Sequence, residues 1–258
     1  MPGDSALGVL YHAPNLVTDD QIIEVLSKCG FNLGFVPVPR RTYELCLIAC
    51  TQDGQALSLV PHHLRTYELC KIAVSNDIYV LDFVPVELLT EDLFIAAIKY
   101  GNKRNNNEQG LARIPAEYRS YVVCLEAIKS NPLDLKYVPY GHVTYEMCLL
   151  VVRANPCLIS IIPTKFLNEE LAMIAITKDP ITFRYLPLAL LKNMKLNDNI
   201  LIDMVKDTPY VIQHIPQDVI QISEYLWLEF IKLTDRALMH CCNKTEKMKT
   251  LHKMLWEV

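Results

Sequence analysis

Proline residues recur at a fixed interval along this chain, and no other sequence feature limits the possible fold so strongly. One series comprises Pro37, Pro61 and Pro85, which stand 24 residues apart. A second series has the same interval and comprises Pro115, Pro139, Pro163 and Pro187. Each of these prolines follows Val, Ile or Leu. A fixed interval of this size is typical of a tandem array in which every repeat forms one structural unit.

A helix-capping residue stands five positions after most of the repeat prolines. These residues are Thr42, Thr66, Thr90, Ser120, Thr144 and Asn168, with Thr18 one position earlier in its repeat. Such side chains favour the N-cap because their oxygen accepts a hydrogen bond from a backbone N–H of the first turn. Apolar residues then recur with i, i+4 spacing, as at Leu69 and Ala73 or at Cys70 and Val74. The pattern predicts a helix of about ten residues with two adjoining buried faces.

A second helix-start signal follows the first helix in several repeats. It is an N-cap residue followed by proline, at Asn131-Pro132, Asn155-Pro156, Asp179-Pro180 and Thr208-Pro209. Proline is favoured at the first helical position, and the next Val-Pro or Ile-Pro step ends the helix because the residue before proline avoids the α region. We therefore predict a second, short helix of about seven residues, partly of 3-10 geometry.

Together these signals predict an all-α fold, an α-solenoid of about 24-residue repeats, each with one helix of about ten residues and one short helix. We divide the chain into a divergent N-terminal unit and cap at 1–36, tandem repeats at 37–222, and a C-terminal helical cap at 223–258. Insertions near 100–110 and 188–197 interrupt the interval and are expected in loops. Helices this short are marginal alone, so stacking between repeats must stabilise them.

The charge and hydropathy of the chain disfavour nucleic-acid binding and insertion into a membrane. The formal net charge is -4, so long-range attraction to phosphate backbones is absent and we expect no nucleic-acid partner. No apolar run approaches the roughly 18 residues of a membrane span. The segment from Met1 to Leu10 lacks the pattern of a secretory signal. We expect a soluble cytoplasmic protein without a membrane span.

The repeats share a recognisable motif. It reads Thr-Tyr-Glu-Leu-Cys-x-x-Ala at Thr42 to Ala49 and at Thr66 to Ala73, and it joins to Leu-x-x-Val-Pro. This motif resembles a tandem helical repeat catalogued as a domain of unknown function, seen in bacterial effector-like and giant-virus proteins. The alternation of a longer and a shorter helix is also similar to leucine-rich repeat variant solenoids. The resemblance covers about 33–215 and implies proteins that act on host cells, with delivery into the host cytosol for a bacterial effector. It implies no activity, ligand or catalytic residue.

Two groups of polar residues have no evident role in stacking and are candidates for binding a protein partner. The first group lies in the turns after two repeat prolines and comprises Arg40, Arg41, His62, His63 and Arg65. The second lies in the insertion and comprises Lys103, Arg104, Asn105, Asn106 and Asn107. Loops on a repeat scaffold often carry function. A solvated turn and a tolerated flexible insertion are the alternative interpretations.

Cysteine and tyrosine each recur at one place in the repeat. Cys46, Cys70, Cys124 and Cys148 hold the ninth place. A metal site needs ligands that converge on one point, and one cysteine per repeat does not converge, so these thiols are expected in the core. Tyr43, Tyr67, Tyr121 and Tyr145 hold the first helical place. We favour contacts between repeats for them over an exposed partner-binding ladder.

His240, Cys241, Cys242 and His252 form the only local cluster of soft ligands. Adjacent cysteines on a helix point about 100° apart, so packing of a terminal helix is the favoured interpretation. No phosphate-binding loop, zinc motif or catalytic motif is present, and we expect neither a cofactor nor a metal.

The sequence therefore favours a non-enzymatic protein-interaction scaffold, and the identity of the partner is left open. The alternative is a cysteine-dependent hydrolase or transferase that uses Cys241 or another exposed thiol to act on a host protein. Repeat-by-repeat binding of RNA is a third hypothesis, which the acidic balance disfavours.

Overall fold

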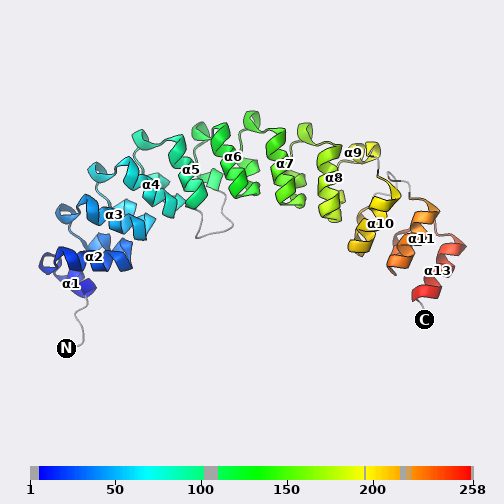
Figure 1. Ribbon diagram of the computed structural model, residues 1–258, viewed down its shortest axis with the longest axis horizontal. Helices are drawn as coiled ribbons and strands as arrows, with labels where there is room; N and C mark the ends of the chain where they lie inside the picture. Colours follow the sequence, from blue (N-terminus) through cyan, green and yellow to red (C-terminus); the bar gives the residue numbers. More distant parts are fainter. Residues whose placement is uncertain (1–5, 102–109, 195, 216–219, 221, 257–258) are drawn as a thin grey trace. The chain divides into compact units, whose positions relative to one another are not determined.

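The computed structural model describes residues 6–101, 110–194, 196–215, 220 and 222–256. These residues form α helices and 3-10 helices joined by short turns, and no β strand occurs among them. They fall into two compact units, Met1–Val143 and Thr144–Val258. The all-α repeat fold that the sequence predicts is confirmed (Figure 1).

The first unit alternates α helices with two kinds of 3-10 helix. Its α helices are α1 (Ala6–His12), α2 (Asp19–Lys28), α3 (Tyr43–Gln52), α4 (Tyr67–Asn76), α5 (Glu91–Tyr100) and α6 (Tyr121–Ser130). The longer 3-10 helices are η2 (Gly30–Phe35), η4 (Gly54–Leu59), η6 (Ile78–Phe83), η8 (Gly110–Arg113) and η10 (Pro132–Tyr137). Three-residue 3-10 turns lie at the repeat prolines, namely η1 (Pro14–Leu16), η3 (Val38–Arg40), η5 (His62–Leu64), η7 (Val86–Leu88), η9 (Ala116–Tyr118) and η11 (Tyr140–His142).

The second unit continues the same alternation and ends in α helices. Its α helices are α7 (Tyr145–Ala154), α8 (Glu169–Lys178), α9 (Leu188–Asn193), α10 (Asp198–Asp207), α11 (Glu224–Leu233), α12 (Ala237–His240) and α13 (Glu246–Trp256). Its 3-10 helices are η12 (Pro156–Ile161), η13 (Thr164–Phe166), η14 (Pro180–Tyr185) and η15 (Pro209–His214). The insertion near 188–197 contains α9, a short helix where other repeats have a three-residue turn. No described helix is both long enough and apolar enough to cross a lipid bilayer.

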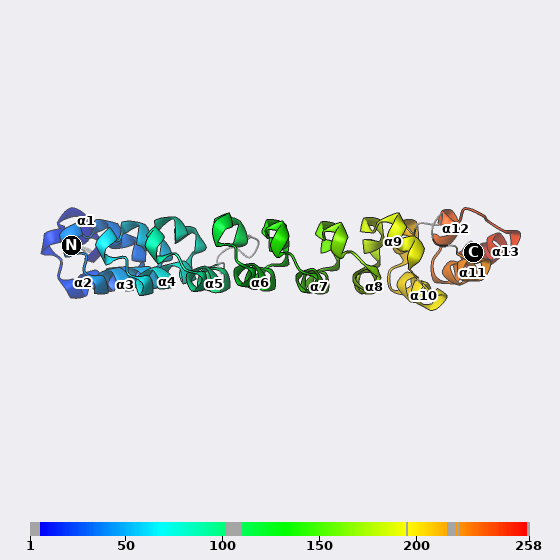
Figure 2. The ribbon, with the colours of Figure 1, turned by 90° about the horizontal axis from the view of Figure 1, so that it is seen from above.

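Within each unit the longer α helices form one row and the 3-10 helices form another (Figure 2). Consecutive α helices pack against one another, as do α3 with α4 and α4 with α5 in the first unit, and α7 with α8 in the second. The longer 3-10 helices pack in the same way, as do η2 with η4 and η12 with η14. Each repeat therefore contributes one element to each row, and the apolar core lies between the rows.

Each N-cap that the sequence predicts for an α helix is present in the structure. The hydroxyl of Thr66 accepts a hydrogen bond from the amide of Leu69 at 3.3 Å. Equivalent side-chain caps occur at Thr18, Thr42, Thr90, Ser120, Thr144 and Asn168. Asn131, Asn155 and Asp179 cap the following 3-10 helices through the amide two residues later. Thr208 forms no such bond.

The repeated apolar positions fill the core. Leu69, Cys70, Ala73 and Val74 of α4 have no exposed surface. Small residues allow the rows to approach closely. Gly54, the first residue of η4, faces the end of α4, and a Cβ atom at this position would overlap the carbonyl oxygen of Ala73. A glycine is therefore required by the distance between the backbones, and its φ angle plays no part.

Candidate functional site

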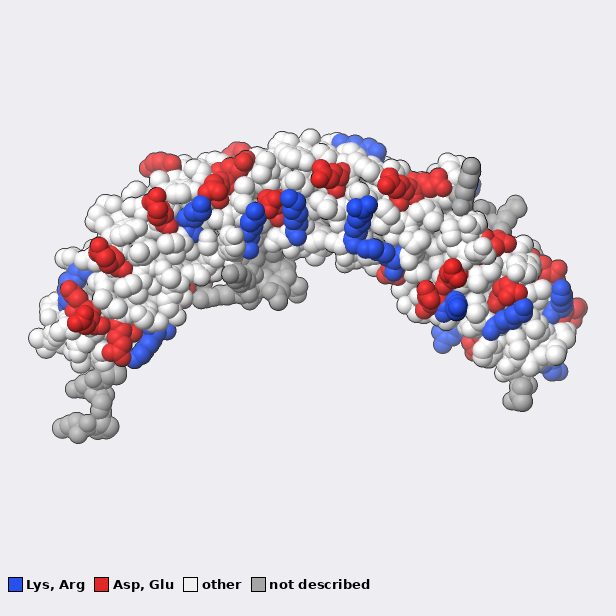
Figure 3. Space-filling model, viewed as in Figure 1, with Lys and Arg blue, Asp and Glu red and all other residues white. Residues whose placement is uncertain are grey.

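The surface of the α-helical row carries charges that are paired between repeats (Figure 3). Lys71 of α4 forms an ion pair with Asp92 of α5 at 2.5 Å, and the hydroxyl of Tyr67 donates to the same carboxylate at 2.8 Å. These two contacts, with Lys71 the stronger, lower the pKa of Asp92. In the second unit, Tyr145 donates to Glu170 at 2.6 Å. The predicted contact between repeats is thus confirmed for Tyr67 and Tyr145.

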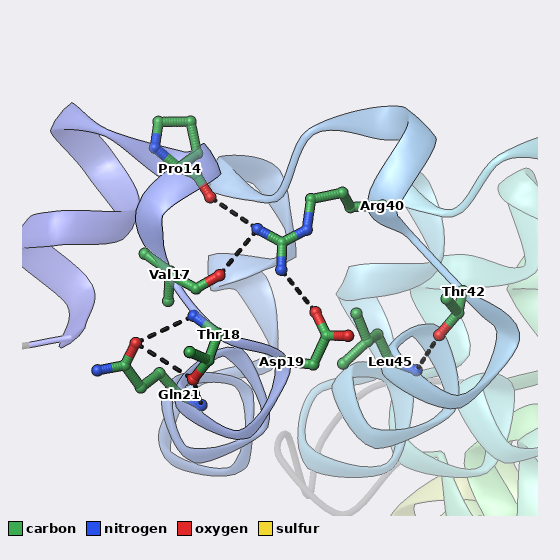
Figure 4. A network of polar contacts seen from close by, with 8 residues as sticks. All are labelled: Pro14, Val17, Thr18, Asp19, Gln21, Arg40, Thr42 and Leu45. Atoms are coloured by element: carbon green, nitrogen blue, oxygen red, sulfur yellow. Dashed lines mark hydrogen bonds and ion pairs between the residues drawn. The ribbon is translucent and has the colours of Figure 1, made fainter.

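Arg40 binds back to the first repeat of the chain (Figure 4). Its Nη1 donates to the carbonyl oxygens of Pro14 and Val17, each at 2.9 Å. Its Nη2 forms an ion pair with Asp19 at 2.5 Å. These contacts hold the turn before α2 against η3, which gives this candidate partner-binding residue a role within the fold.

Arg41 and Arg65 join one proline turn to the next. The Nε of Arg65 donates to the carbonyl oxygen of Val60 at 2.9 Å, and its Nη1 donates to that of Phe83 at 2.7 Å. Arg41 makes the same pair of bonds to Val36 and Leu59. Arg119 makes them to Ile114 and Tyr137. We call this arrangement the arginine bracket. Arg119 was not among the candidates from the sequence, although an arginine four places after a repeat proline is the signal that it shares with Arg41 and Arg65.

Of the remaining candidates from the sequence, the structure describes only His62 and His63. His62 and His63 lie in η5 and are exposed. Lys103, Arg104, Asn105, Asn106 and Asn107 lie outside the described residues, so their proposed role in partner binding stays a prediction.

An open groove lies beside His62, between two consecutive proline turns. It is lined by His62, Arg65 and residues 82–87. The bond from Arg65 to the carbonyl oxygen of Phe83 links its two sides. Phe83 is 41% exposed and Val86 is 71% exposed, whereas Val84 between them is buried. The groove is therefore a fixed recess with apolar side chains that face solvent.

This groove is part of a longer exposed series. We define the turn ridge as five exposed side chains of the first unit that lie at the end of η2 or η6, or directly after Pro37, Pro61 or Pro85: Phe35, Val38, His62, Phe83 and Val86. Val38 is 57% exposed and Phe35 is 40% exposed. Some equivalent places in other repeats hold polar residues, such as Arg113 and Thr164, whereas others hold apolar or aromatic ones, such as Leu188 and Tyr140. Stacking therefore does not require apolar side chains at these places.

Most of the cysteine thiols are shielded. Burial raises the pKa to about 11 for the ninth-place thiols Cys46, Cys70, Cys124 and Cys148. Cys241 is 4% exposed, its Sγ lies 3.8 Å from the Sδ of Met248, and burial raises its pKa as well. A nucleophilic cysteine needs a lowered pKa. The surroundings of Cys241 thus favour the unreactive thiol. The described residues contain no group of three or more His, Cys, Asp or Glu side chains that could hold a metal ion.

Asp134 is a buried carboxyl group next to the returning end of the insertion. It is 1% exposed, and its Oδ2 accepts a hydrogen bond from the amide of Leu111 at 3.2 Å. Its Oδ1 has no hydrogen-bond partner in the described structure. Burial raises the pKa of Asp134 to about 6, and Lys136 and Arg119 offset only part of that effect.

The raised pKa of Asp134 predicts a pH-dependent cost to stability. Between about pH 4 and pH 6 the folded state retains this proton and the unfolded state has released it, so stability falls as pH rises through that window. Asp134→Asn is expected to be more stable than the wild type by about 2 kcal/mol at neutral pH, and the gain should vanish towards about pH 4. Urea unfolding across this pH range measures the difference, with Asp82→Asn as the control for loss of one exposed carboxylate. A gain that stays constant with pH would contradict the assignment.

A family model described as a domain of unknown function, DUF4116, matches residues 42–89. This segment runs from the N-cap of α3 to the residue after η7 and includes the groove residues 82–87. The match fits the resemblance to a catalogued domain of unknown function. Neither the curated proteins nor the solved structures include a match to the chain.

Proposed function

We propose that this protein is a non-enzymatic scaffold that binds a protein partner through the turn ridge of its first unit. The exposure of Phe83 at the end of η6 and of Val86 at the start of η7 carries the proposal. Exposed apolar side chains that gather on one surface commonly mark a binding site, whereas single ones are ordinary.

The arginine brackets support this function because they fix the turns that present the ridge. Arg41 and Arg65 each hold two consecutive turns through backbone carbonyl groups. A surface fixed before binding loses less conformational entropy when the partner binds. The brackets thus favour recognition by a preformed surface.

The partner that we propose is a protein of a host cell, met in the host cytosol. This part of the proposal rests on the resemblance of the repeat motif to bacterial effector-like and giant-virus proteins. The shielded thiol of Cys241 favours the scaffold over the alternative of a cysteine-dependent enzyme that uses Cys241.

Site-specific photo-crosslinking tests the proposal. A photoreactive phenylalanine analogue is placed at Val86, at Val38, or at the control position Ser130, which is exposed at the end of α6. Each protein is then irradiated in a eukaryotic-cell lysate. We expect the two ridge positions to capture the same protein and Ser130 to capture none of it. Equal capture from all three positions, or none from the ridge, would refute the scaffold function assigned to this surface.

A further inference from the structure

The groove between η5 and η7 combines exposed apolar and acidic side chains. Phe83 and Val86 supply the apolar part, and Asp82 and Glu87 flank them in the sequence as exposed carboxylates. Within the described structure, neither carboxylate takes part in an ion pair or a hydrogen bond. The groove therefore presents two carboxylates that no ion pair of the described structure occupies, although Arg65 also lines it.

The other repeats show that this chemistry is not needed for folding. The place held by Asp82 is Ser58 one repeat earlier and Lys136 two repeats later. The place held by Glu87 is His63 one repeat earlier and Gly141 two repeats later. Since the same backbone turn forms with these different side chains, the pair of carboxylates is a property of this turn alone in the first unit.

On the α-helical row of the same unit, in contrast, acidic side chains take part in ion pairs. There Asp92 is paired with Lys71, and Glu126 is paired with both Lys99 and Lys129. Arg65 is a cation within the lining of the groove, and its guanidinium donates to two carbonyl groups and holds the two turns together. Its position is fixed by those bonds, so the carboxylates of the groove remain open to a cation from outside.

We propose that this groove binds an extended segment of the partner protein in which cationic side chains flank an apolar one. The inference rests on the proposed scaffold function and specifies the partner's chemistry. The apolar side chain packs on Phe83 and Val86, and cationic side chains on either side of it pair with Asp82 and Glu87. Charge complementarity of this kind contributes specificity, and salt screens it at an exposed site.

Three synthetic peptides serve as probes, because the natural segment is unidentified. Each is capped, carries a fluorophore, and has glycine residues around a central Lys-Leu-Lys, Lys-Ser-Lys or Glu-Leu-Glu. Fluorescence anisotropy measures binding to the full chain. We expect Lys-Leu-Lys to bind best, with an affinity that falls as NaCl rises from about 50 mM to about 500 mM. Amide NMR signals of His62, of residues 82–84 and of residues 86–87 should shift most on titration.

Two variants locate the contact. Asp82→Asn combined with Glu87→Gln keeps the shape of the groove and removes its charge, and it should weaken Lys-Leu-Lys binding about tenfold. Glu117→Gln is the matched control, because Glu117 holds the place of Glu87 in the next repeat and lies outside the groove. Circular dichroism checks that both variants fold.

Three outcomes would overturn the inference: no preference for Lys-Leu-Lys, equal binding by the double variant, or NMR shifts centred elsewhere. Measuring the oligomeric state of the chain on dilution tests for self-association through the groove. Self-association would also overturn the inference, because a second copy of the chain would then occupy the groove in place of a partner segment. The scaffold function is judged separately. If Val86 still captures a protein while the double variant changes nothing, only the cationic–apolar specificity fails.

Discussion

Replacing Gly54 with alanine is expected to destabilise the protein by about 3 kcal/mol, because an added methyl group has no space between two backbones. Its carbon would overlap the carbonyl oxygen of Ala73 and lie 3.1 Å from both the amide nitrogen of Asp77 and the Cβ of Asn76. Backbone atoms of α4 cannot rotate away as a side chain can, so η4 and α4 would have to separate. Urea unfolding followed by circular dichroism measures the loss.

Gly141→Ala is the matched control. No atom lies within 4 Å of a Cβ at this exposed position in η11, so its effect should stay within about 0.5 kcal/mol. Similar losses for Gly54→Ala and Gly141→Ala would show that close backbone contact does not limit the spacing of these repeats.

Leu69→Ala is expected to cost about 2–5 kcal/mol, because it leaves a cavity in the middle of the first unit. Leu69 has no exposed surface, and its helix, α4, packs against both α3 and α5. Stability in a repeat array comes from such junctions between neighbours, so one cavity weakens the helices on both sides. The same urea experiment measures the change.

Leu16→Ala is the control, because it removes the same side-chain atoms from a leucine that is not in the core. Leu16 is 78% exposed, and its replacement should cost less than about 1 kcal/mol. A loss below about 0.5 kcal/mol for Leu69→Ala would mean that the buried face of the repeat helix has been assigned wrongly.

The fold was predictable because it depends on local signals that recur. A capping hydroxyl at Thr66 and an i, i+4 apolar pair at Leu69 and Ala73 each define a helix within a few residues. Because the same signals recur in successive repeats, each repeat supports the same assignment of helices. The short proline turns such as η5 were harder to predict as 3-10 helices, since three residues carry no periodic pattern.

The candidate site was less predictable, because its contacts join residues from different repeats. A basic residue in a turn suggests a solvated or partner-binding side chain, yet Arg65 bonds to the carbonyl group of Phe83, 18 positions later. The burial of Asp134 was equally unpredictable from the sequence, since an acidic residue in a short helix is ordinarily exposed. Phe83 and Val86 are apolar, so the sequence favours a place in the core for both. Only the structure of the turn shows that they face solvent.

The arginine bracket has a consequence for how such a chain can change over generations. Its acceptors are peptide oxygens, which every amino acid supplies, so the junction places no demand on the side chains of the two turns that it joins. Positions beside Arg65 can therefore exchange acid for base, or aliphatic for hydroxyl, while the coupling between neighbours is conserved. One architecture can in this way acquire new binding preferences turn by turn without being refolded.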